Sequence, residues 1–110
     1  FSLVIPCYNE AENIPILVKK YRKLLKLKDS ELILVNNGSI DNTEKVFKKL
    51  KKFKNIKTNK IKKNIGFGYG LRKGLSKAKN NHIIYSHADP EVDPNDIFKA
   101  IKILSKKENF

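Results

Sequence analysis

The clearest sign of the fold is the run Leu32-Ile33-Leu34-Val35, which is followed at once by Asn36-Asn37-Gly38-Ser39. A continuous apolar run of strand length predicts a strand buried on both faces of a sheet. Asn, Gly and Ser are typical turn residues, so the strand at 31–35 is expected to end there in a turn. Residues 1–5, which Pro6 ends, repeat the pattern. The chain therefore holds at least two buried strands.

Two weaker strands and four helices alternate with these runs. Residues 56–61 alternate apolar and polar side chains, as an edge strand does, and 82–86 read as a short strand. Apolar residues recur at helical spacing in the segments 14–25, 46–50, 66–79 and 94–106, and Asn13 is the expected cap of the first helix. This order predicts an α/β fold with a doubly wound, mostly parallel, Rossmann-like sheet covered on both faces.

Length and cysteine usage limit the kind of protein. With 110 residues the chain can hold one domain or part of a larger one. It opens at Phe1 inside a strand pattern and stops without a terminating feature, so we expect a partial domain over 1–110. No apolar run approaches the length of a membrane span. The single cysteine, Cys7, excludes an internal disulfide and favours a cytoplasmic location, or the cytoplasmic face of a membrane.

The charge is strongly positive, at +13, and its 24 basic residues include only two arginines, Arg22 and Arg72. Arginine binds phosphate and guanine through two parallel hydrogen bonds, whereas lysine is a hydrated point charge. We therefore expect no specific nucleic-acid recognition. A solvated, lysine-rich surface is the simplest interpretation. Weak attraction to anionic lipid headgroups or acidic polymers is the alternative, and with it a peripheral membrane contact.

Three polar clusters follow the predicted strands: residues 7–10, 36–41 and 87–91. In open α/β sheets, ligands bind just beyond the carboxyl ends of the strands, which is where these clusters fall. Asp89 and Glu91 are carboxylates two residues apart, and such a pair could hold Mg²⁺ or Mn²⁺ against a diphosphate. The alternative is that Asp89-Pro90 and Asp93-Pro94 only start turns and cap a helix.

In their order, these clusters carry a family resemblance. Ile5-Pro6-Cys7-Tyr8-Asn9-Glu10, Val35-Asn36-Asn37-Gly38-Ser39-Ile40-Asp41, Asn64-Ile65-Gly66 and His87-Ala88-Asp89 resemble the successive signatures of family 2 glycosyltransferases, which have the GT-A fold. The resemblance runs from residue 2 to about residue 98. It implies the N-terminal, nucleotide-sugar-binding half of an enzyme that transfers a sugar from a nucleotide diphosphate sugar, usually with inversion and with a divalent metal.

The resemblance also implies roles for single residues. A UDP- or GDP-linked donor would lie against eight residues: Pro6, Tyr8 and Glu10 in the nucleotide pocket, Val35 and Asn37 beside the base, His87 and Ala88 near the ribose and diphosphate, and Asp89 at the metal. Glu91 matches a second metal ligand of dolichyl-phosphate-sugar synthases. The general base and most contacts to a saccharide or lipid-linked acceptor would lie beyond residue 110. Cell-envelope polysaccharide or glycolipid synthesis is the implied context.

Two positions depart from the family pattern. Asn36 and Asn37 replace an aspartate pair, and His87 replaces the first aspartate of the Asp-X-Asp motif, so weaker metal binding is expected. A nucleotidyltransferase acting on sugar nucleotides and a basic nucleic-acid or anionic-surface binding module are the competing hypotheses. The glycines of residues 66–70 favour a helix start or close helix–sheet packing over a dinucleotide loop.

Overall fold

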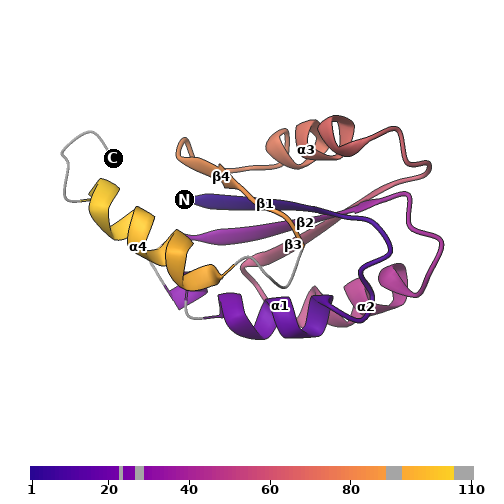
Figure 1. Cartoon of the computed structure of the whole chain (residues 1–110), viewed down its shortest axis with the longest axis horizontal. Helices are drawn as coiled ribbons and strands as arrows, with labels where there is room; N and C mark the ends of the chain where they lie inside the picture. The colour runs from indigo at the N-terminus through magenta and orange to yellow at the C-terminus, as the bar shows by residue number, and fades with distance from the viewer. Residues whose placement is uncertain (23, 27–28, 89–92, 106–110) are drawn as a thin grey trace.

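A computed structural model describes residues 1–22, 24–26, 29–88 and 93–105, except for the side chains of residues 24, 104 and 105. A four-stranded parallel sheet in the order β3-β2-β1-β4 forms its centre (Figure 1). The strands are β1 (Ser2–Cys7), β2 (Glu31–Asn37), β3 (Ile56–Ile61) and β4 (Ile83–Tyr85). The helices are α1 (Ile14–Tyr21), α2 (Thr43–Lys49), α3 (Phe67–Leu75) and α4 (Pro94–Ser105), with single turns at η1 (Leu24–Lys26) and η2 (Leu50–Lys52).

Helices cover both faces of the sheet, as the sequence predicted. Figure 1 shows α3 on one face and α1 and α2 on the other. Ile14, Phe47 and Ile101, from α1, α2 and α4, share one buried cluster with alternate residues of β1 and β2. Val4 and Val35 point the opposite way and form a smaller cluster against α3. The alternation follows from the two-residue period of a strand, which sends neighbouring side chains to opposite faces.

The two central strands are longer than predicted. β1 continues through Pro6 to Cys7, and β2 continues to Asn37, so the sequence prediction was wrong to end them at residues 5 and 35. The carbonyl of Val4 accepts from the N–H of Ser86 on the β4 side. Pro6 lies two residues further along β1, so its backbone faces the same β4 side. The pairing of β1 with β4 ends at Val4, so no hydrogen bond is lost because proline lacks an N–H.

The helix ends also differ from the prediction. α1 stops at Tyr21 and α3 at Leu75, several residues before the apolar pattern fades. Asn13 precedes α1, but its side chain makes no capping hydrogen bond and instead donates to Glu10 Oε2 at 2.7 Å. Within the described ranges, none of the helices has both the length and the apolar character that crossing a bilayer requires.

A buried polar network fastens the amino ends of the strands. Glu31 is 1 % exposed and accepts from the Ser2 hydroxyl at 2.5 Å and from the Lys79 N–H at 2.7 Å. Its other oxygen lies 2.7 Å from Lys57 Nζ. Asn80 then donates to Ser2 Oγ at 3.1 Å and to the Asp29 carbonyl at 2.8 Å. One carboxylate thereby links β1, β2, β3 and the segment that leads into β4.

Helix α3 packs unusually close to the sheet at two glycines. A Cβ on Gly74 would lie 2.2 Å from Val4 Cγ1, and one on Gly70 would lie 2.9 Å from the Asn37 side chain. Gly68, by contrast, faces open space. Close helix–sheet packing, one of the two interpretations of the glycine-rich segment, is therefore confirmed at Gly70.

Candidate functional site

The predicted site residues gather at one edge of the sheet. Because β1, β2 and β4 are parallel, their carboxyl ends meet at the same edge. Tyr8 follows β1 directly, Asn37 is the last residue of β2, and His87 lies two residues beyond β4. We call the strand-end residues 8–13, 36–43, 63–67 and 86–88 the rim. The topology thus brings together four segments that the sequence places far apart.

Asn9 and its partners join the first two loops of the rim. Asn9 Oδ1 accepts from the backbone N–H of Ile40 at 2.9 Å and of Asp41 at 3.3 Å, while its own N–H donates to Ser39 Oγ at 3.0 Å. Asn9 has φ 52°, a left-handed conformation that asparagine tolerates better than most residues. The short polar side chain and the unusual backbone together hold the β1 loop against the β2 loop.

Asp41 adds a second link between the same loops. Its carboxylate accepts from the Thr43 N–H at 2.9 Å, from the Thr43 hydroxyl, and from the Ala11 N–H at 3.3 Å. Partial burial by itself would raise the pKa of Asp41, but these donors outweigh it and hold the pKa below its ordinary value. The charged form is therefore the one that fits the rim.

Replacing Asp41 with Asn tests this link. An amide has only one acceptor oxygen, so at least one of the three donors loses its partner, and we expect a loss of about 1 kcal/mol in the free energy of unfolding. Urea titration at neutral pH measures it. Ile40→Ser is the control, because Ile40 is 84 % exposed and should change stability little. Equal stability of Asp41→Asn and the parent chain would show that the link contributes nothing.

The end of β2 contacts the start of α3. Asn37 is 3 % exposed, and its Nδ2 donates to the Gly66 carbonyl at 3.1 Å. Gly38 has φ +71°, and a Cβ there would lie 2.2 Å from the Asn64 backbone nitrogen. Only glycine fits both the conformation and the contact. Among the described residues, Asn37 Oδ1 has no hydrogen-bond partner although it is buried.

An aromatic contact joins the remaining loop. The imidazole of His87 stacks on the Phe67 ring at the start of α3, with centroids 4.9 Å apart and planes 24° apart. Together with the Asn9, Asp41 and Asn37 contacts, this stack connects all four strand-end loops into one continuous rim. Sequence reasoning missed Phe67, because nothing in its local pattern separates a rim aromatic from a core one.

The individual site residues fall into three groups. Tyr8, 43 % exposed, and His87 present rings at the surface of the rim, while Glu10 is half-buried and accepts from Asn13. Pro6, Val35 and Ala88 are buried, and Val35 packs against α3. Asp89 and Glu91 lie outside the described residues. The ligand-binding roles given to these eight residues and to Asn37 therefore stay predictions.

The buried thiol and amide at the strand ends have structural roles. Cys7 is fully buried, which confirms it as a small buried side chain. Burial and the nearby charge of Glu10 raise the pKa of its thiol far above the usual range. Asn36 Nδ2 donates to Glu44 at 2.7 Å, and its Oδ1 accepts from the Ser39 N–H. Asn36 thus shapes the turn after β2.

The part of the rim that is described does not by itself form a metal centre. No group of three His, Cys, Asp or Glu side chains within the described ranges is arranged to hold an ion. Asp41 already accepts three hydrogen bonds, and His87 is stacked on Phe67. The metal-ligand roles given to Asp89 and Glu91 fall outside the described residues and stay predictions.

Two curated relatives are similar in sequence over nearly the whole chain. A poly-beta-1,6-N-acetyl-D-glucosamine synthase from Staphylococcus epidermidis is 28 % identical over 105 residues, which are 96 % of this chain and 25 % of the relative. An undecaprenyl-phosphate 4-deoxy-4-formamido-L-arabinose transferase from Proteus mirabilis is 34 % identical over an alignment of 107 residues that covers 91 % of this chain and 32 % of the relative. The chain thus spans about a quarter to a third of these relatives.

Solved structures share the fold, which confirms the predicted α/β architecture. TarS 1–349 from S. aureus matches with a TM-score of 0.78 and 21 % identity, over 98 % of this chain and 33 % of that one. The mannosyltransferase PcManGT from Pyrobaculum calidifontis, in complex with GDP-Man and Mn²⁺, matches with a TM-score of 0.72 and 20 % identity, over 80 % and 27 %. The sequence model described as "Glycosyl transferase family 2" matches residues 2–109, and this chain therefore belongs to that family.

Proposed function

We propose that this chain forms the donor-binding part of a glycosyltransferase that moves a sugar from a nucleotide diphosphate sugar to an acceptor. The observation that carries the proposal is the continuous rim, in which four strand-end loops are joined at the edge where α/β sheets bind ligands. Family membership supports it, as do the complexes of TarS with UDP-GlcNAc and of PcManGT with GDP-Man. The family match favours this hypothesis over a nucleotidyltransferase.

The rim offers groups suited to a nucleotide. The half-exposed Tyr8 ring can stack on a base, as aromatic rings commonly do. Asn37 Oδ1 is an unused acceptor that suits a ring N–H of uracil or guanine. Because this oxygen is buried and lies beside Gly70 of α3, a base reaches it only when this part of α3 shifts. The donor-binding proposal therefore includes a small movement of that segment.

The finer parts of the proposal concern the metal, the stereochemistry and the acceptor. We assign Asp89 and Glu91 to a divalent cation, Mg²⁺ or Mn²⁺, because a cation offsets the charge that the departing nucleoside diphosphate gains. The Mn²⁺ in the PcManGT complex supports this assignment. Transfer with inversion, a saccharide or lipid-linked acceptor, and a cytoplasmic site of action complete the proposal. The names of the two relatives support a role in cell-envelope polysaccharide or glycolipid synthesis.

Ligand-induced thermal stabilisation tests donor and metal binding together. A ligand at about ten times its Kd stabilises the folded state by about 1.4 kcal/mol, which raises the Tm by several degrees. We expect such a rise with one member of a panel of UDP- and GDP-sugars, and a larger rise when Mg²⁺ or Mn²⁺ is added. Asp89→Ala should abolish the metal-dependent part only.

The control for this experiment is Asp96→Ala, which removes an exposed carboxylate from the first turn of α4. It should leave the ligand-induced rise unchanged even where the Tm itself moves. No rise with any nucleotide sugar would contradict the proposed function. A metal-dependent rise that survives in Asp89→Ala would remove this residue from the metal site while leaving donor binding intact.

A further inference from the structure

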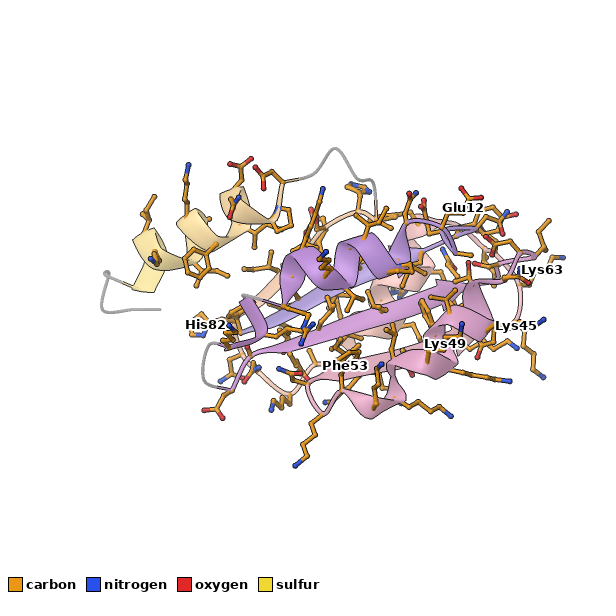
Figure 2. The ribbon with its side chains drawn as sticks, turned by 90° about the horizontal axis from the view of Figure 1, so that it is seen from below. Glu12, Lys45, Lys49, Phe53, Lys63 and His82 are labelled. Carbon is orange, nitrogen blue, oxygen red and sulfur yellow. The ribbon has the colours of Figure 1, made fainter. Side chains whose placement is uncertain are left out.

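A groove lies between α1 and α2, on the face of the sheet opposite α3. Its volume is about 320 Å³, and its apolar lining consists of Pro15, Val18, Val46, Leu50 and Phe53. Val18 and Leu50 are buried, whereas Val46 and Phe53 are half-buried and so form the accessible floor. Figure 2 views the molecule from this side and shows Phe53, Lys45 and Lys49 along α2 and its continuation. The donor rim lies elsewhere, at the strand ends.

The edge of this groove is entirely basic. Four cations line it: Lys19, Arg22, Lys49 and Lys52. The guanidinium carbon of Arg22 is 5.8 Å, and Lys52 Nζ is 5.3 Å, from the centroid of the Phe53 ring. These distances are those of cation–π contacts, so both cations stay beside the apolar floor.

The surrounding helices carry almost no compensating charge. Residues 14–26 contain no Asp or Glu, and residues 43–54 contain only Glu44, which accepts from Asn36. Six further cations of these segments are exposed at described positions: Lys20, Lys26, Lys45, Lys48, Lys51 and Lys54. Within the described ranges, no carboxylate forms an ion pair with any of the four groove cations. The whole α1–α2 face therefore presents positive charge around an apolar groove.

We propose that the α1–α2 face binds the surface of an anionic phospholipid bilayer. The cations of Lys19, Arg22, Lys49 and Lys52 contact lipid phosphates, and the groove floor accepts the first acyl carbons of one lipid. Attraction to an anionic leaflet contributes about 1 kcal/mol per basic residue near the surface, so ten exposed cations suffice for measurable binding. Ile16, which is 50 % exposed on α1, adds apolar contact area in the same region.

The chemistry of the face favours a lipid surface over a nucleic acid. Nine of the ten exposed cations are lysines. A lysine can pair with a singly charged headgroup, but it cannot form the two parallel hydrogen bonds by which arginine recognises phosphates and bases. The accessible groove floor combines the aliphatic Val46 with one aromatic ring, Phe53, whereas single-stranded nucleic acids stack successive bases on several aromatic rings. The charges are spread over two helices and their ends and do not form a single line that could follow a nucleic-acid backbone. A broad, charged plane is the matching partner.

Binding at this face leaves the donor rim accessible. α1 and α2 lie along one face of the sheet, whereas the rim lies at the ends of the strands, where Lys63 is labelled in Figure 2. A bilayer that contacts these helices therefore lies along one face of the sheet and does not cover the rim. The proposal does not depend on donor binding, and either can fail alone.

Co-sedimentation of the full chain with vesicles tests the proposal. Phosphatidylcholine vesicles with about one-third phosphatidylserine should bind the chain, pure phosphatidylcholine vesicles should not, and raising the salt should weaken binding because it screens exposed charges. The quadruple variant Lys19→Gln, Arg22→Gln, Lys49→Gln, Lys52→Gln should bind roughly a thousandfold more weakly. Its thermal shift with a nucleotide sugar should equal that of the parent chain.

The matched control removes the same number and kinds of charge elsewhere. The control variant Lys62→Gln, Arg72→Gln, Lys73→Gln, Lys77→Gln changes exposed cations before, on and after α3. It should lose less than about fivefold in vesicle affinity. Equal losses in the two variants would show that net charge alone attracts the vesicles and would overturn the proposal. So would binding to single-stranded DNA without binding to anionic vesicles, which would assign the face to nucleic acid.

Discussion

Glu31→Ala is expected to lower the free energy of unfolding by about 2–4 kcal/mol, because it leaves two hydrogen-bond donors without their acceptor. The substitution removes the carboxylate that accepts from Ser2 and from the Lys79 backbone and that lies 2.7 Å from Lys57. The buried Ser2 hydroxyl and the part-buried Lys79 N–H then lose their acceptor. Urea unfolding followed by circular dichroism measures the loss. Glu12→Ala, at an exposed carboxylate, should change stability by less than about 0.5 kcal/mol.

The contribution of Glu31 should also depend on pH in a defined direction. Burial alone would raise its pKa, but hydrogen bonds from Lys57, Ser2 and Lys79 outweigh burial and lower the pKa below its ordinary value of 4.5. Below pH 4.5 the unfolded chain therefore binds a proton that the native chain does not, so stability falls with falling pH. The stability difference between the parent chain and Glu31→Gln should be constant above this range and shrink below it. A difference that grew with acidification would contradict the lowered pKa.

Gly74→Ala is expected to destabilise the chain by about 2–3 kcal/mol, although alanine is the better helix former. The new methyl group would lie 2.2 Å from Val4 Cγ1 and 3.1 Å from Val35 Cγ2, in the small cluster between α3 and the sheet. Both valines are buried and β-branched, so they have little freedom to turn away. The helix must then move off the sheet. Thermal or urea unfolding measures the cost.

Two comparisons separate this steric effect from helix propensity. Gly68→Ala lies in the same helix but faces open space, so it should stabilise the chain by about 0.5–1 kcal/mol. The double variant Val4→Ala, Gly74→Ala should be destabilised by less than the sum of the single variants, because removing Cγ1 relieves the overlap. Additive losses would show that the close approach of Gly74 to Val4 is not the cause.

The sequence determined the architecture because its signals are local and redundant. The apolar runs of β1 and β2, the edge alternation of β3 and the helical spacing between them fix a parallel α/β sheet. The strand-end positions of Tyr8, Asn37 and His87 followed from the same pattern, since parallel strands end at one edge. The lengths of the strands could not be predicted in the same way. The polar residues Asn36 and Asn37 indicate a turn in the sequence, but in the structure they pair with Lys60 and Ile61 of β3 and so belong to β2.

The contacts that join the strand-end loops into one rim, and the groove between α1 and α2, are visible only in the tertiary structure. Asn9 reaches residues 39–41, and Phe67 meets His87, across separations that no local pattern encodes. The groove between α1 and α2 depends likewise on how two helices pack over one sheet face. Such contacts depend on how the helices and strands pack against one another, because only this packing fixes where side chains point and how close two backbone segments come.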